Sequence, residues 1–157
     1  MMTEWILPCL SAFAGTLGFG LLIRAPRRSL LPASLIGAGI FTLYIAMNRL
    51  GIADPASFFL CSLTGSILAL CCAAKMKMIG TVFLMLSIVS FVPGLGLYRS
   101  MRFLGAGLTS EGVDQGIGAM VTILMIALGQ GTGSLVFRAF RAGRAALRSP
   151  RHSSRPR

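Results

Sequence analysis

The sequence predicts an all-α fold, a polytopic integral membrane helix bundle of five transmembrane helices whose fourth helix is broken at a Pro-Gly pair. Composition is the first observation behind this fold class. Of the 157 residues, 55% are hydrophobic and only 12% are charged, whereas soluble domains carry about 25% charged residues. The second observation is that the apolar residues form long uncharged blocks, without the amphipathic period of a half-buried helix. Lipid is therefore the expected solvent, and a soluble domain is excluded.

Five apolar blocks are each long enough to cross a bilayer. A helix of about 17 to 25 apolar residues spans about 30 Å of hydrocarbon, and it satisfies its own backbone hydrogen bonds there. Five uniformly apolar segments are too few for a barrel. The predicted transmembrane domain covers residues 1–137, with helices at about residues 5–23, 29–48, 56–74, 78–98 and 116–137.

The first two blocks begin in ways that fit transmembrane helices. Glu4 precedes the first block and basic residues follow it, which is the reverse of the charge order in a secretory signal peptide. We therefore expect a retained helix with its N-terminus on the outer side of the membrane. In the second block, Pro32 must sit in the first helical turn, where a missing N–H group costs little.

The third and fifth blocks contain small residues at four-residue spacing. Ser62 and Ser66 form such a pair in the third block, and Gly129 and Gly133 form one in the fifth. Small residues at this spacing let two helices approach closely within a membrane. Helix packing is therefore the role that we expect for all four.

The fourth block contains a proline that should kink or break its helix. Pro93 lacks an N–H group and its ring clashes with the carbonyl of Val89, and Gly94 loosens the backbone further. The freed backbone groups are costly in lipid unless neighbouring helices or water take them up. Transporters place such breaks at substrate sites, although a kink that only shapes helix packing is the alternative.

Polar side chains after this break, and others in the fifth block, are candidates for a substrate path. Arg99 and Arg102 lie three residues apart on one helical face, and a guanidinium group suits a carboxylate. The alternative is that both arginines reach the outer head groups. The candidate path consists of Pro93, Gly94, Tyr98, Arg99 and Arg102, together with the mid-membrane residues Gln130 and Thr132.

The placement of charges predicts the orientation, because basic residues of short loops stay in the cytoplasm. A cytoplasmic C-terminus puts twelve of the fifteen basic residues on that side: Arg24, Arg27, Arg28, Lys75, Lys77 and the seven arginines from Arg138 to Arg157. All four acidic residues then fall outside. Residues 138–157 form a basic cytoplasmic tail that we expect to be disordered beyond about residue 149. Anionic lipids are the expected partner of this tail, and nucleic acid is not.

The sequence predicts neither an enzyme nor a metal or cofactor site. The four cysteines form no CxxC pair, and the only histidine, His152, lies in the tail. No metal-ligand set at the usual spacing results. The acids lie at helix ends or in loops, so a buried acid, base or activated nucleophile is not expected. Any coupling group must then come from a partner or from the helix ends.

Two short motifs resemble a known family. Pro93 and Gly94 followed by Tyr98, and Phe19-Gly-Leu-Leu-Ile-Arg-Ala-Pro26 followed by Leu30, are similar to motifs of the small YjjB-like subunit of the bacterial threonine/serine exporter family. The resemblance spans most of residues 5–137, but it does not include the arginine-rich tail. Only Pro93, Gly94 and Tyr98 correspond residue by residue.

The resemblance implies a subunit of a secondary exporter in the bacterial inner membrane. Its solutes would be small carboxylate metabolites, either threonine and serine or succinate-like dicarboxylates. It also implies a hetero-oligomer with a larger YjjP-like membrane subunit. The alternative is a structural or assembly membrane protein with no transport activity of its own. A channel or an independent homo-oligomeric transporter is a third possibility.

Overall fold

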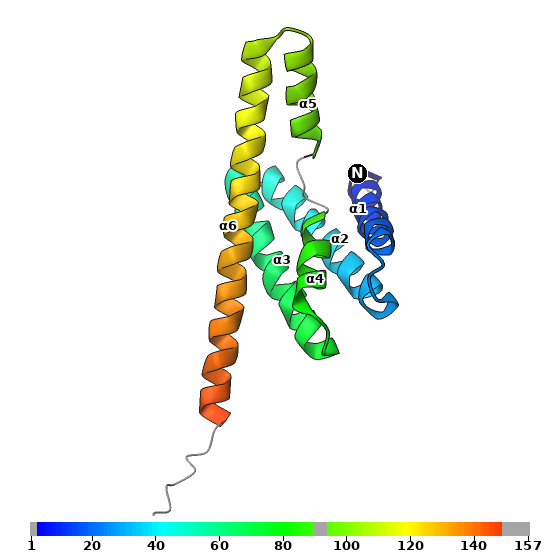
Figure 1. Cartoon of the computed structure of the whole chain (residues 1–157), viewed down its shortest axis with the longest axis vertical. Helices are drawn as coiled ribbons and strands as arrows, with labels where there is room; N and C mark the ends of the chain where they lie inside the picture. Colours follow the sequence, from blue (N-terminus) through cyan, green and yellow to red (C-terminus); the bar gives the residue numbers. More distant parts are fainter. Residues whose placement is uncertain (1–2, 90–93, 149–157) are drawn as a thin grey trace, which may run out of the picture.

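The computed structural model describes residues 3–89 and 94–148, with side chains described for residues 6–89 and 94–144. Within these ranges the chain consists of helices joined by short turns, without a strand (Figure 1). The helices are α1 (Thr3–Leu22), α2 (Arg27–Arg49), α3 (Asp54–Met76), α4 (Gly80–Val89), α5 (Gly94–Gly105) and α6 (Thr109–Arg148). The predicted all-α class is thus confirmed for the described part of the chain.

The number of membrane spans is the point on which structure and prediction differ. By length and composition, α2, α3 and α6 can each cross a membrane, whereas the described apolar part of α1, Ile6–Leu22, is shorter. Helices α4 and α5 together are long enough for a fourth span, but they lie at 52° to one another. The bundle therefore provides three or four candidate spans, and the predicted count of five is not confirmed.

The predicted break in the fourth helix falls partly outside the described residues. Helix α4 ends at Val89 and α5 begins at Gly94, while Pro93 belongs to residues 90–93, which the structure does not describe. A break at Pro93 and Gly94 therefore stays a prediction. Helix α5 continues to Gly105, beyond the predicted end at residue 98.

Close turns reverse the chain direction between α3 and α4 and between α5 and α6. Lys77 ends α3 in the left-handed conformation, with φ 54°, and the N–H of Met78 donates to the carbonyl of Ala73 at 3.0 Å. Gly107 has the same left-handed conformation in the turn between α5 and α6, with φ 78°. Glycine adopts this backbone conformation without strain. The result is two helical hairpins, α3–α4 and α5–α6.

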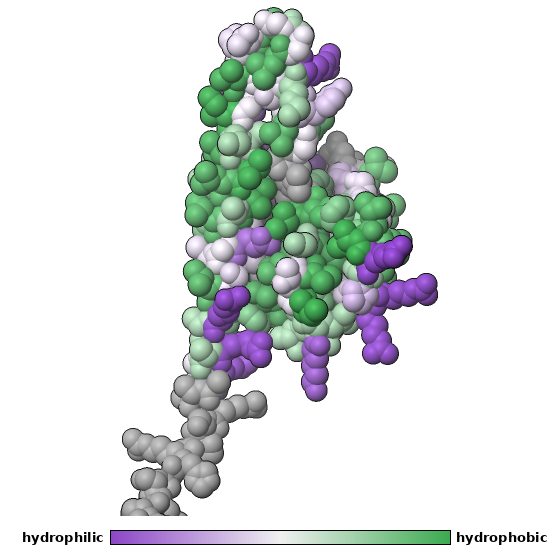
Figure 2. All heavy atoms as spheres, viewed as in Figure 1, coloured by the Kyte–Doolittle hydropathy of each residue, from purple (hydrophilic) through white to green (hydrophobic). Residues whose placement is uncertain are grey.

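Most of the buried side chains are small, with Phe83 and Leu86 as large exceptions, and many large apolar side chains face outward. Ser34 is 0% exposed, whereas the adjacent Leu35 is 65% exposed. A core cluster joins α2, α3 and α4 and contains Ala33, Ala69, Ala73, Phe83 and Leu86. Apolar residues cover most of the visible surface (Figure 2). Such a surface suits lipid, and small residues inside suit closely packed membrane helices.

Helix α6 is much longer than the apolar block that predicts it. Its 40 residues extend over about 60 Å at 1.5 Å per residue, which is twice the hydrocarbon thickness of about 30 Å. It begins at Thr109 and continues through residues 138–148, the first half of the predicted tail. The predicted disorder beyond about residue 149 concerns residues outside the described part of the chain.

The two ends of the bundle differ in charge. The α1–α2 turn, the α3–α4 turn and the last turns of α6 lie at the same end (Figure 1). This basic end carries Arg24, Arg27, Arg28, Lys75, Lys77, Arg138, Arg141 and Arg144, and hydrophilic side chains project from it in Figure 2. The α5–α6 hairpin extends from the opposite end of the bundle (Figure 1).

Candidate substrate path and a basic pocket

The four small residues of the third and fifth apolar blocks form one seam between α3 and α6. Ser62 Oγ donates to the carbonyl of Ile126 at 2.7 Å. A Cβ at Gly129 would lie 2.5 Å from the carbonyl oxygen of Phe59, and a Cβ at Gly133 would contact the side chain of Ser66. Real Cβ atoms do not approach a backbone oxygen this closely, so only glycine fits at these two positions.

Gln130, next to this seam, links α6 to α4. Its Nε2 donates to the carbonyl of Leu84 at 3.3 Å, and Ser87 Oγ donates to the same oxygen at 2.9 Å. The main chains of α4 and α6 are not in direct contact, because each helix packs separately on α3. The half-buried Gln130 side chain therefore bridges the space between these two helices.

Thr132 lies on a different face of α6 from Gln130. Its side chain is exposed, and its Oγ1 donates to the carbonyls of Leu128 and Gly129 at 2.8 and 3.0 Å. The hydroxyl is thus satisfied within its own helix. The structure does not bring Thr132 and Gln130 together on one surface.

The candidate residues of α5 lie far from Gln130. Tyr98 is 64% exposed, and Gly94, Arg99 and Arg102 are also exposed. Among the described helices, α5 packs only against α6. A Cβ at Gly96 would lie 3.4 Å from that of Ala119.

The spacing along α6 separates these residues from the middle of the bundle. From Ala119 to Gln130, α6 rises by about 16 Å. The predicted path residues therefore fall into two separate groups, and Pro93 lies outside the described residues. The described residues of the candidate path do not form one compact site.

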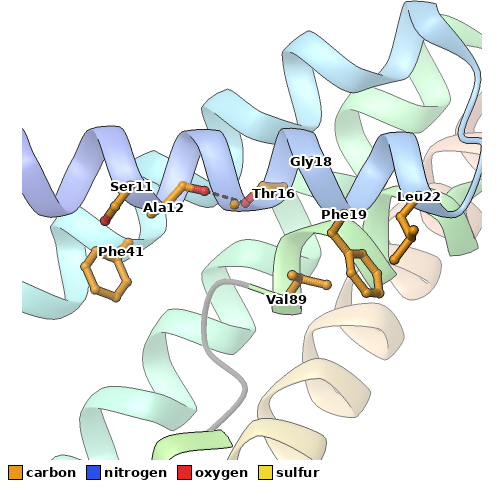
Figure 3. A pocket seen from close by; sticks show the side chains of 9 residues that line it. Ser11, Ala12, Thr16, Gly18, Phe19, Leu22, Phe41 and Val89 are labelled. Carbon is orange, nitrogen blue, oxygen red and sulfur yellow. Dashed lines mark hydrogen bonds between the residues drawn. The ribbon is translucent and has the colours of Figure 1, made fainter.

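An open pocket of about 650 Å³ lies beside α1, with Phe41 and Val89 contributed by α2 and α4 (Figure 3). The described residues of its lining are mostly apolar, and none of them is charged. Thr16, one of its two hydroxyl residues, is only 1% exposed and its Oγ1 donates to the carbonyl of Ala12 at 2.8 Å. This pocket can hold apolar groups, but it offers no charge to recognise a carboxylate.

A second pocket, of about 420 Å³, has charged side chains in its lining. It lies at the basic end between α3, α4 and α6, and its lining includes Thr81, Ser134, Arg138 and Arg141. The sequence alone does not predict this pocket, because arginines at this position already fit the rule that basic residues stay in the cytoplasm. The only available signal was that Ser134, Arg138 and Arg141 recur at the spacing of one helical face.

The side chains that most often bind metal ions are dispersed over the described part of the chain. Among the described residues, no group of three or more histidine, cysteine, aspartate or glutamate side chains is placed to hold a metal ion. The described cysteines are free thiols at four positions, Cys9, Cys61, Cys71 and Cys72. What the described part of the chain offers is helix packing, hydroxyl groups and arginines.

An apolar helical bundle with several candidate spans and a basic end defines a multi-pass membrane protein. The chain belongs to the threonine/serine exporter family, because the family model described as "Threonine/Serine exporter, ThrE" matches residues 8–136. This is a family of transporters and not a class of enzymes. The resemblance seen in the sequence is confirmed at the level of the family. Comparisons with curated proteins and with solved structures gave no match.

Proposed function

We propose that the chain is one subunit of a secondary exporter of small carboxylate metabolites in the bacterial inner membrane. Threonine and serine are the first candidate solutes, and succinate-like dicarboxylates are the second. The observation that carries the proposal is the family match over residues 8–136, which reaches from α1 to the middle of α6 and so includes the whole seam between α3 and α6. The N-terminus lies outside and the C-terminus in the cytoplasm, an orientation supported by the basic residues gathered at one end of the bundle.

The partner in this proposal is a larger YjjP-like membrane subunit. If Arg138 lies at the cytoplasmic head groups, about 30 Å of hydrocarbon along α6 ends near Gly118. The first turns of α6 and the later turns of α5, which lie beside them, are then beyond the lipid tails. Their exposed apolar side chains include Met101, Leu104, Val113 and Ile117. Because lipid tails do not reach this surface, a protein partner is the natural cover for it.

The same placement gives Arg99 and Arg102 a role outside the hydrocarbon. Both are exposed on α5, on the side of the membrane to which the solute is released. There they attract carboxylates by charge, without the desolvation penalty of a mid-membrane arginine. The path inside the membrane then depends on Gln130 and on groups that the partner provides.

Metabolite efflux tests the proposal directly. Cells that express both subunits, either one alone, or neither are loaded with threonine, serine or succinate, and the external concentration is followed with time. We expect efflux of at least one solute only when both subunits are present. Equal efflux with and without this chain would contradict the proposal. If the partner then also failed to assemble without this chain, the structural alternative would take its place.

A further inference from the structure

The basic pocket lies between two helices that pack on the same third helix. Helices α4 and α6 both pack on α3, and their main chains stay apart. The gap between them is the 420 Å³ pocket, with Leu84 in its lining. Gln130 reaches the carbonyl of Leu84 and so ties α4 to α6 beside the pocket. The arginines of the lining belong to the basic end of the bundle, which is the level of the lipid head groups when the bundle spans a membrane.

Two arginines supply the positive charge of this pocket. Arg138 and Arg141 both line it, and their three-residue spacing puts them on one face of α6. The guanidinium carbon of Arg141 lies 6.0 Å from the ring centroid of Phe137, a residue of the same lining. The aromatic ring thus helps to hold the guanidinium group beside the pocket.

The described acidic residues all lie far from these arginines. Asp54 begins α3 at the opposite end of that helix, and Glu111 and Asp114 are in the first turns of α6. Asp54 accepts a hydrogen bond from Asn48 at 2.8 Å. No described acidic side chain lines the pocket. Its two positive charges are therefore available to an anion from outside the chain.

The first turn of α4 adds donors to the same pocket. Gly80 and Thr81, the first two residues of this helix, are in the lining. The first N–H groups of a helix have no partner within it, and the helix dipole makes this end positive. Together with the Thr81 hydroxyl and the guanidinium groups, they make a donor set that suits an oxygen anion.

We propose that this pocket is an oxyanion-binding site, occupied by the phosphate of an anionic phospholipid. Leu70, Met78 and Phe137 are also in the lining, so the pocket offers apolar contact next to its charges. A phospholipid matches this combination, with its phosphate at the arginines and its glycerol and acyl carbons against the apolar side. The carboxylate of an exported solute has the same oxyanion chemistry and is the second possible source. That second assignment rests on the proposed function, whereas the lipid assignment does not.

The test measures binding to the purified full-length chain in detergent. Phosphatidylglycerol is titrated and bound lipid is counted by native mass spectrometry, with phosphatidylcholine of the same acyl chains as reference. L-serine, succinate and inorganic phosphate are tested separately by the shift of the thermal unfolding midpoint. The variant is Arg138→Gln with Arg141→Gln. The control is Arg28→Gln with Arg144→Gln, which removes equal charge from the same end but leaves the pocket lining intact.

We expect phosphatidylglycerol to bind the native chain and the control alike, and the pocket variant about tenfold or more weakly, because charged hydrogen bonds are lost. Replacement of both arginines by lysine should restore only part of the affinity, since lysine lacks the guanidinium fork. If the double substitution weakens binding of serine or succinate and not of the lipid, the pocket is still an oxyanion site, but its occupant is a carboxylate. Equal loss in the variant and in the control, or no binding of any anion, would overturn the proposal. Efflux is measured independently, so failure here leaves the proposed function untouched.

Discussion

Ser62 of α3 donates its hydroxyl proton to the carbonyl oxygen of Ile126 in α6, with 2.7 Å between the two oxygens. This bond joins residues far apart in the chain, at a level where Gly129 has no room for a Cβ. It therefore sets the position of α6 along α3. The same register places Arg138 and Arg141 beside the first turn of α4, and so it also creates the basic pocket.

A methyl group at Gly129 should weaken the seam between α3 and α6. In Gly129→Ala the new Cβ would lie 2.5 Å from the carbonyl oxygen of Phe59, so the helices must move apart. We expect the free energy of unfolding to fall by about 1 to 3 kcal/mol, as for other overpacked sites. Thermal unfolding of the purified chain in detergent measures the change. The matched control is Gly131→Ala, whose Cβ meets nothing within 4 Å. This control should be neutral or slightly stabilising, because alanine favours helix over glycine, and equal effects of the two changes would contradict the seam.

Removal of the Ser62 hydroxyl should have a smaller effect. Ser62→Ala eliminates the bond to Ile126, and hydrogen bonds between membrane helices contribute about 0.6 kcal/mol on average. Thr64→Val is the control, because it removes a hydroxyl that bonds to the carbonyl of Leu60 in its own helix. Both variants are compared with the native chain by thermal unfolding. A loss larger than that of Gly129→Ala would show that the hydroxyl, and not the close approach, dominates the seam.

Gln130 and Thr132 should differ in their effect on export. Gln130 bridges α6 and α4, whereas Thr132 is exposed and bonded within its own helix. We expect Gln130→Leu to reduce efflux several-fold with little loss of stability, because the carbonyl of Leu84 keeps its bond from Ser87. Thr132→Val should leave efflux unchanged. The measurement is the initial efflux rate of each variant at equal amounts of protein in the membrane. A larger loss of efflux in Thr132→Val than in Gln130→Leu would exclude Gln130 from the path.

The Pro-Gly pair should be required for export but not for insertion. Replacement of Pro93 and Gly94 by alanine lets an unbroken helix form, since proline and glycine are the two weakest helix formers. We expect loss of efflux with an unchanged amount of protein in the membrane fraction. Pro32→Ala, which removes a proline within α2, serves as the control and should retain efflux. Normal efflux of threonine, serine and succinate in the double variant would exclude a role for the break.

Thiol labelling checks the orientation. In a background without native cysteines, Ala106→Cys lies in the turn between α5 and α6, and Met76→Cys lies at the basic end of α3. Both positions are exposed. A membrane-impermeant maleimide added to intact cells with a permeabilised outer membrane should label position 106 and not position 76. The reverse pattern would place the basic end outside.

The sequence predicts the apolar middle of the bundle better than its ends. Predicted helices at residues 29–48 and 56–74 differ from α2 and α3 by at most two residues at each end, because hydrocarbon length limits such segments. Glu111 and Asp114 before the fifth apolar block, and Arg138 after it, suggest that the helix is limited to this block. Helix α6 nevertheless continues past them, since outside the hydrocarbon charged residues are good helix formers or are readily solvated.

Tertiary contacts explain what the sequence does not reveal. The position of α5 depends on Ser100, whose Oγ donates to the carbonyl of Gly112 at 2.7 Å across the hairpin. The basic pocket depends on α4 and α6 packing separately on α3. Neither relationship has a local signal. The sequence therefore predicts a substrate path around Pro93. The pocket lined by Arg138 and Arg141 lies at the other end of α4.

The contrast between Ser34 and Leu35 has a consequence for how such a chain can diverge among organisms. An interior position filled by serine, alanine or glycine has no spare volume, so drift there is confined to a few small residues. An outward leucine such as Leu35 or Leu68 meets fluid acyl chains in a membrane, and isoleucine, valine, methionine or phenylalanine serves equally well. Across descendants of this gene, the outward-facing large apolar residues should therefore vary freely, and the small interior ones should record common ancestry.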